Sequence, residues 1–499
     1  MGIPGSYDDT LQGKADEEVA AVTIDENAQA DWTEAEETSA RRKIDFILLP
    51  ILMLAFFALQ MDRGNISNAL TSTITKDLGV TTNKINVGSS LLSVGIVLLE
   101  LPSNILLQRI GPQRWLSGQI FAWGLVAVFQ SFITTYAGFL VTRVLLGLCE
   151  AGFIPGALYT MSTWYTKKET SSRISIFFLG NILASATVSL IGAGILSMSG
   201  RYGLAGWRWL FIIEGIISIG IGFIFLLFLP PNVGNGSPLI SAGKWSYFSQ
   251  REQYILVRRV ILDDPTKTSG HLRISGADIK KAMLKGRIWV HFLISLMATM
   301  TVTAIQSYGP SIIKSLGFGT VRANAMASVG NFIAAILVVI LGFVADKTKR
   351  RGPTVLAGGI WSLIAYACLL KSVHYNKWHR YAAVVAAMAN NSTIHILNVG
   401  WLSINCKNPQ ERSIAMAMII IAANAAGIAG SQIFRTEDAP VYIKAFTALL
   451  ALSAGVVVVT IALMLWYIFA NRRLARVGGQ IVQGKTENLE ISRQWWWVW

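Results

Sequence analysis

Charged residues are scarce in this chain. Only 14% of its 499 residues are Asp, Glu, Lys or Arg, whereas 53% are hydrophobic. Soluble proteins of ordinary composition carry about 25% charged residues. Too few polar side chains remain to coat a surface that faces water, so most of the chain must face lipid. The composition therefore predicts a membrane protein.

Cysteine is also rare, with only Cys149, Cys368 and Cys406 present. Each lies in or beside an apolar stretch and none has the spacing of zinc ligands, so they predict neither a disulfide framework nor a metal site. A nucleophile–base pair or a cluster of His and Asp ligands, as a membrane enzyme would need, is not visible either. We expect no metal, no cofactor and no enzymatic activity.

No cleavable signal peptide is visible in the N-terminal residues. Residues 1–40 contain eleven acids and one lysine, without the apolar segment of a signal peptide. We expect residues 1–43 to form a disordered, acidic tail. The basic residues of the remainder lie mostly in short loops between apolar runs, which favours contact with lipid headgroups over nucleic acid.

Long apolar runs account for most of the chain. A helix that crosses about 30 Å of hydrocarbon needs roughly 20 apolar residues, and backbone hydrogen bonding in lipid favours helices over open strands. Twelve runs fit, which predicts an all-α membrane protein with twelve transmembrane helices. They cover residues 45–64, 85–107, 115–134, 138–161, 174–197, 209–229, 288–307, 324–345, 354–371, 380–402, 412–434 and 443–470.

The longest internal loop, residues 230–287, divides these runs six and six. Such a repeat is expected of carriers that rock two halves around a central site. We predict an N-terminal half at residues 44–229, a C-terminal half at 288–470 and a tail at 471–499. An even number of helices puts both termini on one side, and the basic residues beside the helix ends make that side cytoplasmic.

Seven segments carry a family resemblance. They are 62–69 (DRGNISNA), 100–104 (ELPSN), 109–114 (RIGPQR), 143–156 (RVLLGLCEAGFIPG), 206–215 (GWRWLFIIEG), 310–317 (PSIIKSLG) and 435–440 (RTEDAP). In combination they resemble the anion:cation symporters within the major facilitator superfamily. They are most similar to the fungal allantoate-permease branch of that family.

This resemblance implies a major facilitator fold, a fungal source and proton-coupled symport of a small organic anion, a carboxylate vitamin or a nitrogen compound. We expect a monomer in the lipid bilayer, in the plasma membrane or else in a vacuolar or other organelle membrane. The loop after the second helix departs from the superfamily pattern, because residues 106–109 lack its usual aspartate. The fifth helix lacks the Gly-Pro pair of drug antiporters, which favours symport.

Ionisable side chains inside a membrane are costly and indicate function. Arg143 and Glu150 lie seven residues apart, which places them on one face of the fourth helix. A buried carboxyl group beside an arginine can gain and lose a proton in the physiological range. We therefore assign proton coupling to Glu150, together with Arg143, Asp62 and Glu100; a structural ion pair is the alternative for Arg143 and Glu150.

Arg63 is the candidate for binding a substrate carboxylate, because a guanidinium offers a planar fork of donors. Reaching toward the membrane interface is the alternative role for this side chain. The other candidate binding groups are neutral and would orient a ligand without fixing its charge. They are Asn65, Gln306, Tyr308, Asn391, His395 and Asn424.

Two loops are candidates for conformational gating. Arg109 and Arg114 lie in the loop after the second helix, and Asp346 and Arg350 lie in its counterpart in the second half. Charge pairing and helix-end contacts in such loops can hold one conformational state. Glu214, close to a pair of tryptophans, is instead expected to be structural.

Two further functions stay open. An exporter or organelle carrier of a fungal secondary metabolite would share these features, because direction depends on gradients as well as on fold. A nutrient sensor on a carrier fold would usually add a long cytoplasmic tail, whereas residues 471–499 are short.

Overall fold

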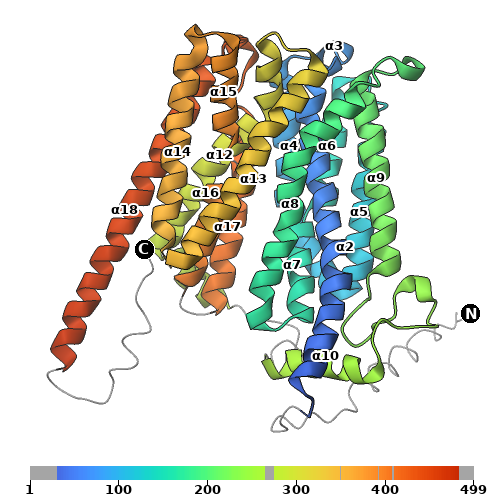
Figure 1. Cartoon of the computed structure of the whole chain (residues 1–499), viewed down its shortest axis with the longest axis vertical. Helices are drawn as coiled ribbons and strands as arrows, with labels where there is room; N and C mark the ends of the chain where they lie inside the picture. Colours follow the sequence, from blue (N-terminus) through green and yellow to red (C-terminus); the bar gives the residue numbers. More distant parts are fainter. Residues whose placement is uncertain (1–30, 264–274, 349, 391–392, 407–408, 483–499) are drawn as a thin grey trace, which may run out of the picture.

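The computed structural model describes residues 31–263, 275–348, 350–390, 393–406 and 409–482, and this part of the chain is almost entirely helical. Helices up to α9 form one group and helices from α12 onward form a second group beside it (Figure 1). The helices are α2 (Glu34–Ala69), α3 (Ile74–Asp77), α4 (Thr82–Ile110), α5 (Pro112–Gln130), α6 (Tyr136–Glu150), α7 (Phe153–Trp164), α8 (Lys167–Leu196), α9 (Gly206–Phe228), α10 (Gln250–Asp263), α11 (Gly276–Met283), α12 (Gly286–Ser315), α13 (Thr320–Thr348), α14 (Arg351–Lys371), α15 (Lys377–Met388), α16 (Thr393–Ile404), α17 (Pro409–Gly430) and α18 (Ile443–Val482).

Ten helical stretches in the described residues are long and apolar enough to cross a membrane. The two other expected spans correspond to α5, which has 19 residues, and to the pair α15 and α16. The expectation of an all-helical membrane protein is confirmed. Its physical basis is simple, since a helix satisfies its own backbone hydrogen bonds where no water can.

The fourth expected span is broken rather than continuous. α6 ends at Glu150, Ala151 is extended, and Gly152 has a φ of +81° before α7 begins. A Cβ on Gly152 would lie 2.5 Å from Ser103 Oγ on α4. Both the left-handed backbone and this close approach require glycine, so the break is built into the sequence.

The first helix begins earlier than the apolar pattern predicts. Thr33 caps α2, because its side chain accepts from the backbone N–H of Glu36 while Glu36 accepts from the N–H of Thr33. This reciprocal cap satisfies two otherwise unpaired donors. Residues 34–43, expected as part of the tail, are therefore helical; residues 1–30 lie outside the described part.

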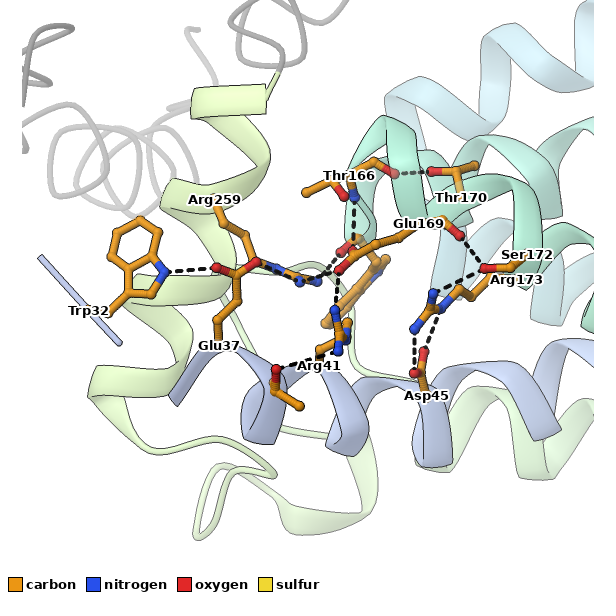
Figure 2. A network of polar contacts seen from close by, with 12 residues as sticks. Trp32, Glu37, Arg41, Asp45, Thr166, Glu169, Thr170, Ser172, Arg173 and Arg259 are labelled. Carbon is orange, nitrogen blue, oxygen red and sulfur yellow. Dashed lines mark hydrogen bonds and ion pairs between the residues drawn. The ribbon is translucent and has the colours of Figure 1, made fainter. Parts of the chain in front are cut away.

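The central loop carries two helices, α10 and α11, and α10 is fixed in place (Figure 2). The buried Arg259 of α10 places Nη1 3.1 Å from Glu169 Oε1, and Arg41 Nη1 lies 3.2 Å from the same oxygen. Nearby, Arg173 Nη2 lies 2.8 Å from Asp45 Oδ2. These ion pairs join α10 to α8 and α8 to α2.

Hydrogen bonds connect the two groups of helices at the end of the molecule where α4 begins. Asn86 donates to the backbone oxygen of Phe434 at 2.6 Å and accepts from the Tyr308 hydroxyl. The Tyr308 ring stacks on Phe434 with 4.9 Å between centroids. Asn324 of α13 donates to Thr71 Oγ1 at 2.6 Å. The groups are thus closed against each other at this end.

Candidate functional site

The centre of the site is an ion pair between α2 and the break after α6. Arg63 Nε donates to Glu150 Oε2 at 2.6 Å. The Glu150 side chain is 0% exposed, whereas 28% of the Arg63 side chain is exposed. Since Glu150 is the last residue of α6, the break at Ala151 and Gly152 sets where its carboxylate points. The pair therefore has one accessible member and one enclosed member.

Arg143 lies deeper in the same group of helices and makes different contacts. Its guanidinium carbon lies 5.3 Å from the Phe139 ring centroid and 5.8 Å from that of Phe211, in the range of cation–π attraction. Its Nε and Nη2 are buried and have no hydrogen-bond partner among the described residues. The ion pair of Glu150 is thus formed with Arg63, not with the arginine two turns away on its own helix.

Two further buried acids, Asp62 on α2 and Glu214 on α9, lie in the same group of helices as Arg143. Asp62 Oδ2 accepts from Ser218 Oγ at 2.7 Å, and its other oxygen has no partner in the described part of the chain. Glu214 is 0% exposed, and both of its oxygens lack a hydrogen-bond partner within the same residues. Asn65, also fully buried, is its polar neighbour. An unpaired buried carboxyl group must hold a proton or gain a partner.

Sequence reasoning gave Glu214 a structural role because of the adjacent tryptophans. The structure places its carboxyl group inside the helix group, in electrostatic reach of Asp62. The sequence did contain a signal for this residue, because Glu214 is an acid inside the apolar run at 209–229. The same feature led to the assignment of Glu150. Glu214 therefore joins the candidate coupling residues.

Glu100 lies on the partly exposed side of the site. Asn424 of α17 donates to Glu100 Oε2 at 3.0 Å, so these two predicted residues join the helix groups. The Arg63 charge also acts on Glu100. Arg63 is consequently flanked by two carboxylates, one on α4 and one at the end of α6.

The predicted binding residues of the second group of helices are dispersed. Gln306 of α12 and His395 of α16 are half-buried, and His395 Nδ1 has no partner among the described residues. Tyr308 is buried in the closure with Asn86 and Phe434. Asn391 lies outside the described part of the chain. Sequence reasoning missed Asn86, whose amide gains significance only from its contacts with distant helices.

The predicted gating residues lie at the end of the molecule away from the closure, where α4 and α13 end. Arg109 and Arg114 are exposed and form no ion pair with the described residues. Arg350 is exposed just before α14. Asp346 lies in α13, but its side chain is outside the described part.

Residues 52–431 match the family model described as Major Facilitator Superfamily. The chain is 30% identical over 410 residues to the MFS-type transporter cnsO of Penicillium expansum, covering 80% of this chain and 77% of that protein. It is 28% identical over 466 residues to the major facilitator-type transporter hxnP of Emericella nidulans, covering 92% of each.

Solved structures show the same fold at low sequence identity. A bacterial homolog of the human lysosomal transporter Spinster, in an inward-facing and unoccupied conformation, matches with a TM-score of 0.62 and 15% identity over 88% of this chain and 98% of that one. A D-xylose–proton symporter matches with a TM-score of 0.63 and 14% identity, covering 84% and 97%.

Proposed function

Because this chain belongs to the major facilitator superfamily, whose members are transporters and not enzymes, we propose that it is a proton-coupled symporter of a small organic anion. The observation that carries the proposal is the ion pair between Arg63 and Glu150. Its exposed member offers a carboxylate-binding fork, and its enclosed member is a carboxyl group that a proton can neutralise.

Competition for Arg63 couples the two solutes. A substrate carboxylate that binds the guanidinium displaces Glu150, and the displaced carboxylate would be left buried without a partner. Uptake of a proton by Glu150 removes that cost. Anion binding and protonation then favour each other, which is the reciprocity that any coupled equilibrium requires.

The charges around the site support the same coupling. Arg63 and Arg143 contribute two positive charges, and Asp62, Glu100, Glu150 and Glu214 contribute four negative charges when ionised, which leaves a net charge of −2. An added anion would be repelled by this excess unless protons bind to some of the carboxylates. Protonation within the buried acids thus prepares the site for an anion.

The closure between the helix groups supports alternating access. We assign the closed end, with Asn86, Tyr308 and Phe434, to the outer face. The end where α2 begins, which carries α10 of the central loop, is then cytoplasmic, in agreement with the distribution of basic residues. The plasma membrane is the proposed location.

Uptake assays test the proposal. Transporter-deficient yeast expressing the chain is given a panel of labelled carboxylates, with and without a protonophore. We expect the cells to take up at least one carboxylate, and we expect the protonophore to abolish this uptake. Uptake that is unchanged by the protonophore would contradict the coupling, and net efflux from preloaded cells would favour an exporter.

A further inference from the structure

A groove lies along α2 at the end where this helix begins. It has a volume of about 860 Å³, and its lining includes Ser39, Arg42, Lys43, Phe46 and Tyr247. The residues change from polar to apolar along the helix, because Arg42 and Lys43 precede Phe46 by one turn. One wall is α2, and the other is the segment of the central loop that precedes α10.

Tyr247 indicates that the groove lies at the boundary of the membrane. Its hydroxyl donates to the backbone oxygen of Phe228, the last residue of α9, at 3.2 Å. Trp245 packs edge-on against Tyr247 with 5.1 Å between centroids and is 45% exposed. Such aromatic pairs are typical of the level where lipid headgroups meet hydrocarbon. Phe46 is 81% exposed and lies on the apolar side.

Arg42 is the available cation of the groove. Its side chain is exposed and forms no hydrogen bond or ion pair with the described residues. Lys43, in contrast, lies 2.7 Å from Glu252 Oε1 and helps to hold α10. Glu34 also lines the groove, but it precedes Arg42 by eight residues and so lies about 12 Å along the helix. The charge nearest the apolar side is therefore positive.

Ion pairs and hydrogen bonds hold α10, the helix that follows the loop segment of the second wall. Arg259 and Arg41 both contact Glu169, and Glu37 lies 3.6 Å from Arg259 while accepting from Trp32 Nε1 (Figure 2). Together with the pair between Lys43 and Glu252, these contacts connect α2, one wall of the groove, to the helix that follows the other wall. A preformed groove costs less ordering on binding than a mobile one.

We propose that this groove binds the headgroup of an anionic phospholipid. The phosphate lies on Arg42, within reach of the Ser39 hydroxyl, and the acyl chains run along Phe46. A guanidinium suits a phosphate because its donors match the geometry of the phosphate oxygens. The apolar part of the groove beside Phe46 suits the acyl chains of a lipid and would gain nothing from free phosphate. The inference uses the orientation proposed above, which places this end in the leaflet that carries anionic lipid.

Native mass spectrometry of the full-length protein tests the lipid site. The purified chain is titrated in mixed micelles with phosphatidylserine or with phosphatidylcholine. We expect the wild-type protein to retain phosphatidylserine, and Arg42→Ala to bind it about fivefold more weakly, the usual contribution of one basic residue at an anionic surface. The matched control is Arg201→Ala, which removes an exposed arginine from the loop before α9 and should bind as the wild type does.

Three results would overturn the lipid site. They are equal binding by Arg42→Ala and the wild type, equal retention of phosphatidylcholine, and displacement of the lipid by inorganic phosphate at the same concentration. Phe46→Ala provides a second variant, for which weaker retention is expected because acyl contact is lost. The readout involves no transported substrate, so failure here leaves the symport proposal standing, and failure of symport leaves lipid binding measurable.

Discussion

Arg63 on α2 and Glu150 at the end of α6 form an ion pair in which only the arginine is accessible. The pair connects residues 87 positions apart in the chain. It joins the predicted anion-binding residue to the predicted proton carrier in one contact. Binding of an anion and pairing with Glu150 thereby become alternatives at a single guanidinium.

Arg63→Lys keeps the charge but removes the planar fork. A charged hydrogen bond contributes about 1.5–3 kcal/mol, so we expect the KM for the transported carboxylate to rise by roughly tenfold or more. Initial uptake rates over a range of substrate concentrations measure this. Arg201→Ala serves as the control, and an unchanged KM in Arg63→Lys would exclude the arginine from substrate binding.

Glu214→Gln tests whether the buried acid of α9 acts in coupling. Glutamine resembles the protonated acid in shape and charge, so the variant should fold with nearly unchanged thermal stability. Proton-driven accumulation should fall, because one protonation site is lost. A large loss of stability with normal accumulation per folded molecule would instead assign Glu214 a structural role.

Tyr308→Phe tests the closure at the proposed outer face. It removes the hydroxyl that donates to Asn86 while keeping the ring stacked on Phe434. Loss of about 1 kcal/mol should increase opening at this end about fivefold. The labelling rate of a cysteine introduced at the buried Ser431, in a chain whose native cysteines are replaced, reports this opening. An unchanged rate would mean that Tyr308 does not hold the closure.

The helices and the candidate functional residues could be predicted from the sequence. The residues that each candidate contacts in the fold could not. Apolar length fixes where a helix can cross lipid, and the seven-residue spacing places Arg143 and Glu150 on one face. The pairing of Glu150 with Arg63 depends on how α2 packs against the break at Gly152, which periodicity does not encode. Tyr308 shows the same limit, since its place in the closure follows from contacts with Asn86 on α4 and with Phe434 in the segment after α17.

Glu169→Gln tests the network that holds α10. Arg259 would lose its 3.1 Å partner while its side chain stays 2% exposed, and we expect a loss of about 2 kcal/mol, since a buried charge is left undercompensated. Differential scanning fluorimetry measures the change. Glu437→Gln removes a pair whose side chains are 60% and 63% exposed and should change stability by less than about 1 kcal/mol.

The same network predicts a dependence on acid. Partial burial raises the pKa of Glu169, whereas the charge of Arg259 and hydrogen bonds from Thr166 and Arg41 lower it. The net effect is a pKa below the usual 4.5. A depressed folded-state pKa contributes stability above pH 4.5, and that contribution disappears as the pH falls through the lower folded value. The stability difference between the wild type and Glu169→Gln should therefore shrink below pH 4.5. A constant difference down to pH 3 would contradict this account.

Reconstituted liposomes containing Glu150→Gln provide the most direct measurement. With a carboxylate that the wild type transports, we predict that the variant still exchanges labelled for unlabelled substrate, because Arg63 stays available without its competing carboxylate. It should not accumulate substrate in response to an imposed pH gradient. Gradient-driven accumulation by Glu150→Gln equal to that of the wild type would contradict the account.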